Sequence, residues 1–238
     1  WRIALLAAPM AVFGLFVVWP LFSSFYYSFT NWNGFDPNYS FVGFDNFAKI
    51  ATDRLFLQAA INTTIWMAAA IVLPTTLGLM LALLLDAQVA GGRVFKSIFY
   101  LPICLSAVIV GQIWTWIYQP DWGLLNTIIA QVTGEKFKYA WLAKPNSALW
   151  SVIAAWSWQQ TGLSMVIYLA GLTAIPGDLL EVCEIEGATP WQRFRRVVLP
   201  LLAPSSVVVV ALSVINSLKG FDILYIMTGG GPFNSSDT

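Results

Sequence analysis

The sequence contains no histidine, and charged residues make up only 10% of its 238 positions. Without histidine the chain lacks the commonest metal ligand and the usual general base near neutral pH. The two cysteines, Cys104 and Cys183, form no CxxC motif, so neither a disulfide framework nor a zinc site is expected. Twelve basic and twelve acidic residues cancel, so no net charge favours nucleic acid as a partner. These absences argue against a metal site and against nucleic-acid binding.

Apolar residues, by contrast, make up 58% of the chain and gather in long runs. A helix that spans a bilayer needs about 20 mostly apolar residues. Buried helices of a soluble protein are the alternative, but they would leave almost no amphipathic helix to face water. We therefore predict an all-α, polytopic membrane helix bundle. The predicted spans are residues 3–29, 58–85, 94–118, 147–174 and 201–227.

The basic residues indicate an orientation only weakly. If Arg2 is cytoplasmic, the inside and outside segments carry nearly equal numbers of basic residues. The short segment with Arg93 and Lys96 then lies inside, which favours this orientation under the positive-inside rule. The segment 175–200 would be cytoplasmic as well.

The segment 175–200 is the most informative part of the chain, because it places four acidic residues and three arginines between two apolar runs. Its pattern is typical of two short helices joined by a tight turn. Asp178 is expected to cap the first helix, with Glu181 three residues later as in a capping box. Gly187 suits the turn, because glycine adopts backbone conformations that other residues resist.

The second short helix is expected to present a docking face. Thr189 and Gln192 have the spacing of a capping box at its start. Trp191, Phe194 and Val198 would then fall on one apolar face, with arginines turned away. Such a helix could dock into a partner protein or lie on lipid headgroups, and the spacing alone does not decide between them.

The same segment resembles the EAA loop of binding-protein-dependent ABC importers. That loop starts with Glu-Ala-Ala, continues with an acid and Gly-Ala, and ends in an apolar residue before Leu-Pro. The matching residues here are Glu181-Val182-Cys183, Glu186-Gly187-Ala188, Phe194 and Leu199-Pro200. This chain departs from the pattern at Val182 and Cys183, which replace the two alanines, and at Glu186, where Asp is commoner.

The resemblance extends along nearly the whole chain, to the first permease subunit of the carbohydrate-uptake group, the maltose, trehalose and glycerol-phosphate type. The order and spacing of the short matches make it specific. They include Trp19-Pro20, Phe41-Val42-Gly43-Phe44-Asp45-Asn46-Phe47, Asn62-Thr63-Thr64, Phe99-Tyr100-Leu101-Pro102, Gly123-Leu124-Leu125-Asn126, Phe221-Asp222 and Thr228-Gly229-Gly230-Gly231-Pro232.

The resemblance implies a single permease domain over residues 1–238, with a six-helix core whose last span follows residue 238. It implies a multi-pass protein of a prokaryotic cytoplasmic (inner) membrane. It also implies three kinds of partner: a second permease subunit in a heterodimer, two copies of a cytoplasmic ATP-binding subunit, and an extracytoplasmic solute-binding protein. ATP and Mg would bind the ATPase, so this chain would hold no cofactor and catalyse no reaction. The residues expected to couple to the ATPase are Glu181, Glu184, Glu186, Gly187, Ala188, Trp191, Phe194, Arg195, Leu199 and Pro200.

Polar side chains within the spans are candidates for the transport pathway, because they are costly in lipid and usually face the bundle interior. Amide groups beside aromatic faces suit a sugar, which offers hydroxyl groups and apolar C–H patches. Hydrogen bonding between helices uses the same residue types, so that alternative stays open. The candidates are Gln112, Trp116, Trp158, Gln159, Gln160, Ser213 and Asn216.

Two other classes of protein compete with an importer subunit. An intramembrane enzyme would need a nucleophile–base pair or a metal cluster, yet the sequence has no HExxH and no GxSxG motif. A channel or a secondary transporter without an ATPase would need no docking loop of this pattern. The sequence therefore favours an ATP-driven importer of a sugar or a sugar-like solute.

Overall fold

A computed structural model describes residues 2–87 and 91–229, and within these ranges the chain is helical apart from loops and one isolated pair of bridged residues. This confirms the predicted all-α class. The predicted motif at residues 228–232 lies partly outside the described residues, because Gly230, Gly231 and Pro232 are not among them.

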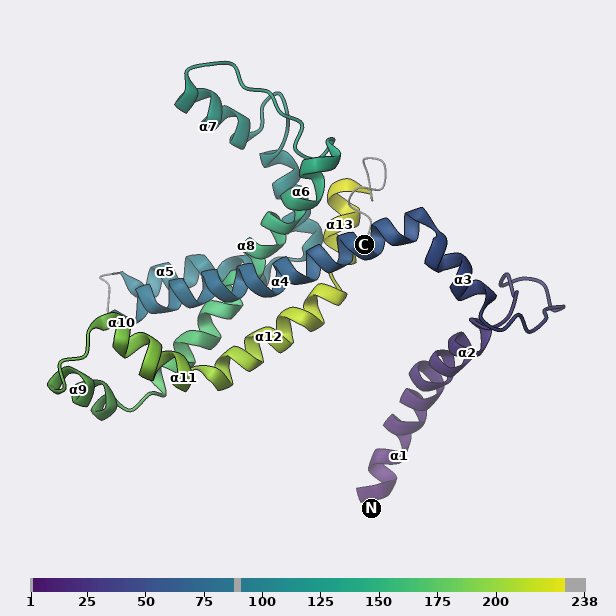
Figure 1. The fold of residues 1–238 in the computed structure, drawn as a ribbon, viewed down its shortest axis with the longest axis horizontal. Coiled ribbons are helices and arrows are strands. Elements are labelled where there is room, and N and C mark those ends of the chain that lie inside the picture. Colours follow the sequence, from purple (N-terminus) through teal and green to yellow (C-terminus); the bar gives the residue numbers. More distant parts are fainter. Residues whose placement is uncertain (1, 88–90, 230–238) are drawn as a thin grey trace. The chain divides into compact units, whose positions relative to one another are not determined.

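Sixteen helical segments follow one another along the described chain (Figure 1). They are α1 (Arg2–Phe13), η1 (Gly14–Val18), α2 (Trp19–Tyr27), α3 (Asp45–Thr52), α4 (Arg54–Asp86), α5 (Gly92–Tyr100), η2 (Leu101–Cys104), α6 (Ala107–Ile117), α7 (Leu124–Thr133), α8 (Pro145–Thr173), α9 (Gly177–Ile185), α10 (Pro190–Arg193), η3 (Phe194–Val198), α11 (Leu199–Leu201), α12 (Ala203–Leu218) and α13 (Phe221–Thr228). Segments η1 and η3 are π-helical, and η2 is a 3₁₀ helix.

The chain divides into two compact units, Trp1–Leu57 and Gln58–Thr238. In the first unit, α1, η1 and α2 follow each other without a break. A bridge between Thr30 and Phe41 then turns the chain back on itself. The Asn46 side chain donates hydrogen bonds to the carbonyl oxygens of Ser28 (3.0 Å) and Thr30 (2.7 Å), which holds the start of α3 beside the end of α2. The prediction of one permease domain over the whole chain stays a prediction.

Two helices of the described chain, Leu6–Tyr27 and Arg54–Asp86, are long and apolar enough to cross a membrane unbroken. The number rises to five if each of three bent helix pairs counts as one span. Two predicted spans are therefore not continuous helices. The run 94–118 bends by 105° between η2 and α6, and the run 201–227 is interrupted where α12 ends and α13 begins.

The bend between η2 and α6 has a local cause and a distant one. Locally, Leu105 adopts an extended conformation (ψ 143°), and the Ser106 hydroxyl caps α6 by accepting from the backbone N–H of Ile109. The distant cause is Gln159 on α8, whose Nε2 donates to the Leu105 carbonyl at 2.9 Å. A carbonyl freed by a broken helix is costly in lipid unless protein groups satisfy it. Gln159 therefore makes the bend tolerable.

Helix α8 is the centre of the second unit, with α4 and α5 along one side and α12 along the other (Figure 1). One buried cluster includes Trp66 and Trp156, whose ring centroids lie 5.4 Å apart. A second cluster includes Met165 and Leu202. At Gly78 a Cβ atom would lie 2.5 Å from the Ser164 Cβ, so α4 and α8 approach closely, as small residues allow in membrane bundles.

The two ends of α8 carry different structures. At its N-terminal end lie α7 and the connector to α8, and at its C-terminal end lie α9 and α10 (Figure 1). The 29 residues of α8 correspond to about 43 Å at 1.5 Å per residue. The hydrocarbon core of a bilayer is about 30 Å thick, so α8 is long enough to separate these two ends by a membrane.

Candidate coupling loop and transport pathway

The turn between α9 and α10 has the geometry that the sequence predicted. Gly187 has a left-handed backbone (φ 71°), which glycine adopts without strain. The Ala188 N–H donates to the Cys183 carbonyl (2.9 Å), and the Gly187 N–H donates to the Glu184 carbonyl (3.0 Å). These two bonds form a Schellman motif, which ends α9 and satisfies its last carbonyls.

Helix α10 begins with a complete capping box. The Thr189 hydroxyl accepts from the Gln192 N–H at 3.3 Å, and the Gln192 side-chain oxygen accepts from the Thr189 N–H at 2.8 Å. Pro190 occupies the first helical position, where its missing N–H costs nothing. This confirms the capping box expected from the sequence.

The prediction that Asp178 caps the first short helix is wrong. Helix α9 begins at Gly177, its capping position is Pro176, and no side chain caps it. Asp178 therefore lies within the first turn, two residues after the capping position. Its negative charge there still suits the positive end of the helix dipole.

An ion pair joins the two short helices, because Arg193 Nη1 on α10 donates to Glu184 Oε1 on α9. Both side chains are partly or largely exposed, so the pair contributes little to stability by itself. Together with the Schellman motif and the capping box, it holds α9 and α10 in one arrangement. The loop from Gly177 to Leu201, which we call the coupling loop, is thus an ordered structure.

The predicted apolar face of α10 is only partly covered. Val198 is buried, Phe194 is half-buried against Trp191 (ring centroids 5.7 Å apart), and Trp191 itself is 65% exposed. The other predicted coupling residues are at the surface or close to it: Glu181, Glu184, Glu186, Ala188, Arg195, Leu199 and Pro200. The coupling loop therefore presents a large aromatic side chain among charged groups.

A π-helical turn connects α10 to the membrane part of the chain. The Leu199 N–H donates to the Phe194 carbonyl, five residues earlier, and Pro200 follows directly. A proline has no N–H and its ring crowds the carbonyl four residues before it, which explains the wider turn. The same arrangement occurs in η1, where Trp19 donates to Gly14 just before Pro20.

Three of the predicted pathway residues meet between α8 and α12. Asn216 Nδ2 lies 3.4 Å from Gln160 Oε1, and both residues line a small cleft with Ser213. Ser164 lines the same cleft and was not predicted, since a serine within a span indicates helix packing equally well. The cleft is lined by four polar and four apolar side chains of α8 and α12.

The other four predicted residues do not line that cleft. Gln159 is buried, and its amide donates to the Leu105 carbonyl at the bend, so its place in the pathway stays a prediction. Trp158 lines an apolar groove between α4, α5 and α8. Gln112 and Trp116 are exposed on α6.

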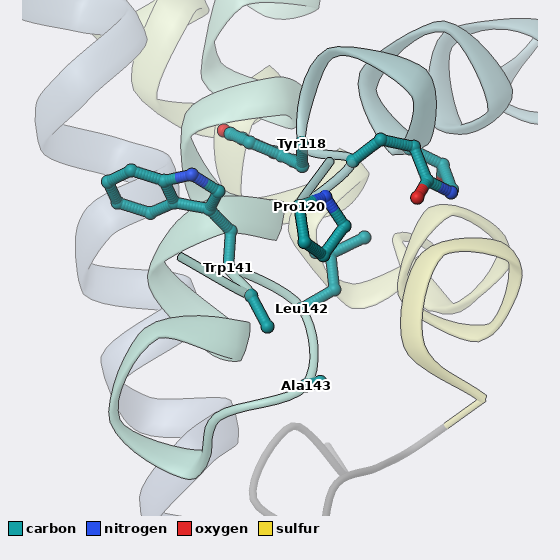
Figure 2. A pocket seen from close by; sticks show the side chains of 8 residues that line it. Tyr118, Pro120, Trp141, Leu142 and Ala143 are labelled. Carbon is teal, nitrogen blue, oxygen red and sulfur yellow. The ribbon is translucent and has the colours of Figure 1, made fainter. Parts of the chain in front are cut away.

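A separate pocket lies at the N-terminal end of α8, where α6 ends (Figure 2). Figure 2 shows Tyr118, Pro120, Trp141 and Leu142 around it. Asn126, which is buried, fixes this region: it accepts from the Trp141 indole N–H at 2.8 Å and donates to the Pro120 carbonyl at 3.0 Å. Sequence analysis singled out Asn126 only as part of a family match, because its partners lie up to fifteen residues away.

Residues 74–237 match the family described as "Binding-protein-dependent transport system inner membrane component". The chain is 34% identical, over 99% of its length and 79% of the relative, to the probable starch degradation products transport system permease protein AmyD of Thermoanaerobacterium thermosulfurigenes. It is also 34% identical to the trehalose/maltose transport system permease protein MalF of Thermococcus litoralis, over 92% of this chain and 73% of that protein.

The fold is similar to a chain in the crystal structure of a bacterial ABC transporter that imports alginate, with a TM-score of 0.82 at 22% identity. That match covers 99% of this chain and 79% of the other. A second structure, of a bacterial alginate ABC transporter with its alginate-bound periplasmic protein, matches with a TM-score of 0.81 at the same identity. At this identity the likeness shows the fold. The chain belongs to the binding-protein-dependent transport system inner membrane component family, and is the transmembrane permease subunit of an ATP-driven importer.

Proposed function

We propose that this permease imports a sugar or a sugar-like solute across the cytoplasmic membrane, and that a separate ATPase drives it through the coupling loop. The observation that carries the proposal is the exposed Trp191 on a loop that three local devices hold in shape. A pre-ordered loop loses little conformational entropy when it docks. An exposed tryptophan is among the residue types that contribute most to binding when a partner covers them.

In this proposal the partners are a second permease, two copies of the ATP-binding subunit and an extracytoplasmic solute-binding protein. ATP and Mg bind the ATPase, and this chain binds no cofactor and catalyses no reaction. The ATPase must contact the coupling loop differently in its two conformations, because equal binding to both would shift no equilibrium. The π turn before Pro200 lies where such a displacement would pass from the loop to α12.

The sugar is proposed from two lines of support. Permeases similar to this chain are named for starch degradation products, for trehalose and maltose, and for multiple sugars. Within the chain, the cleft between α8 and α12 offers the amide groups of Gln160 and Asn216 and the hydroxyl group of Ser213. Such groups can exchange their mutual hydrogen bonds for bonds to sugar hydroxyls.

A pair of tryptophan variants tests the docking step. Trp191→Ala removes the exposed ring of the coupling loop, whereas Trp122→Ala removes a ring of nearly equal exposure (65% against 63%) beyond the other end of α8. A binding hot spot contributes about 2 kcal/mol or more, which corresponds to a loss of affinity of about 30-fold or more. We expect the Kd of the Trp191→Ala permease for its ATPase to rise by that factor when the purified permease is titrated with the purified ATPase. The Trp122→Ala permease should bind the ATPase with the Kd of the wild type. Equal binding by both variants would contradict the proposed coupling.

A further inference from the structure

Helix α3 has two chemically distinct faces, although it is only eight residues long. Phe44, directly before the helix, and Phe47 and Ile50 within it recur every three residues and are exposed by 74%, 42% and 42%. Asp45 and Lys49 lie on the opposite side of the helical wheel. The helix therefore exposes an apolar face and a charged face at the same time.

The apolar face is part of a cluster of aromatic rings that pack against one another. The Phe29 ring packs against Phe44 at 5.4 Å and against Phe47 at 5.3 Å, and these two rings lie 5.9 Å from each other. Phe41 stacks on Phe29 at 6.2 Å and is itself largely exposed. The Asn46 hydrogen bonds fix α3 beside the end of α2, so the rings are presented together.

The position of α3 in the chain brings it to a membrane surface. The span Leu6–Tyr27 precedes this segment, and the span Arg54–Asp86 starts two residues after α3 ends at Thr52. Both ends of the segment are therefore held where spans leave the hydrocarbon core. Tyr27 and Trp32 stack at 4.2 Å in the same segment, and such amphipathic aromatic rings gather at the headgroup level.

We propose that α3 lies in the bilayer interface, with Phe44, Phe47 and Ile50 toward the acyl chains and with Asp45 and Lys49 toward water. A short helix with aromatic residues on one face and charges on the other is suited to this boundary. The apolar surface offers rings and alkyl groups without hydrogen-bonding atoms, and the segment that carries it lies between two helices that are apolar enough to cross a membrane. Lipid is therefore the occupant that the observations favour over a protein partner.

The interfacial helix would set the depth and rotation of the spans on either side of it. Interfacial anchors determine how a helix tilts and turns in the bilayer. Only one residue, Asp53, separates α3 from the start of α4. The proposal depends on the membrane spans and not on the transported solute.

Spin labelling tests the proposal on the complete importer in lipid nanodiscs. In a background of Cys104→Ser and Cys183→Ser, single nitroxide labels are placed by Phe47→Cys and Lys49→Cys, only two residues apart. Collision with lipid-soluble oxygen is compared with collision with a water-soluble nickel chelate. We expect the oxygen-to-nickel ratio to be severalfold higher at position 47 than at position 49.

The opposite results would overturn the proposal. A label at position 47 that is as accessible to nickel as the label at position 49 places the face in water. A label at position 47 that is shielded from both reagents places the apolar face of α3 against protein. Repeating the measurement without the solute-binding protein then shows whether that protein covers the face. Ile50→Cys and Asp45→Cys provide a second pair, so that a label that prevents assembly at one site leaves the comparison intact.

Discussion

Replacing Thr189 with alanine removes the side-chain hydroxyl that caps α10, while leaving the rest of the coupling loop unchanged. The lost bond is the one from the Gln192 N–H, at 3.3 Å, and the reciprocal bond from the Thr189 N–H to the Gln192 side chain is still possible. Loss of such a cap costs about 1 kcal/mol. Short helices are marginal by themselves, so this loss lowers the equilibrium constant for ordering the loop about fivefold.

The consequence for docking follows from the fraction of ordered loop. The apparent Kd for a partner rises as the binding-competent fraction falls, so we expect Thr189→Ala to raise the Kd of the permease for its ATPase by up to about fivefold. The assay is a titration of the permease in nanodiscs with the purified ATPase. Thr189→Ser keeps the hydroxyl and is the matched control, with a Kd close to that of the wild type. A loss of affinity well above fivefold for Thr189→Ala, or an equal loss for both variants, would refute the reasoning.

Two further predictions concern the close contacts of α8. Gln159→Leu leaves the Leu105 carbonyl at the bend between η2 and α6 without its donor. This should lower the free energy of unfolding by about 1–3 kcal/mol in a denaturant titration. Gln112→Leu, at an exposed site, is the control and should change the free energy of unfolding little. Gly162→Ala places a Cβ 2.2 Å from the Phe99 carbonyl oxygen and should cost about 1–3 kcal/mol by the same measurement, while Gly14→Ala meets no atom within 4 Å and should be tolerated.

Features with local causes were predictable from the sequence. The Thr189 capping box and the Gly187 turn depend on residues within a few positions, and both are present. The spans depend on composition and length, so the apolar runs were found without knowledge of the fold. The predicted cap at Asp178 was wrong although the cause is local. The helix already starts at Gly177, so Pro176 and not Asp178 occupies the capping position.

Features with distant causes were not predictable. The bend at Leu105 breaks an apolar run that composition alone describes as one span, and its stabilising partner is Gln159, 54 residues later. The sequence does not show that the Gln159 amide donates to the Leu105 carbonyl, so it could only suggest Gln159 as a candidate for the pathway. The Gln160–Asn216 contact joins residues 56 positions apart, so the sequence could suggest both residues without showing that they meet.

Uptake into vesicles tests the central claim, that an ATPase drives this permease, most directly. Vesicles containing the complete importer are loaded with ATP or with a non-hydrolysable analogue, and a panel of labelled sugars is added outside with the solute-binding protein. We expect at least one sugar to accumulate against its gradient only with hydrolysable ATP, and Trp191→Ala to abolish that accumulation. Uptake that is equally fast with the analogue, as a channel or a secondary transporter would give, would contradict the claim.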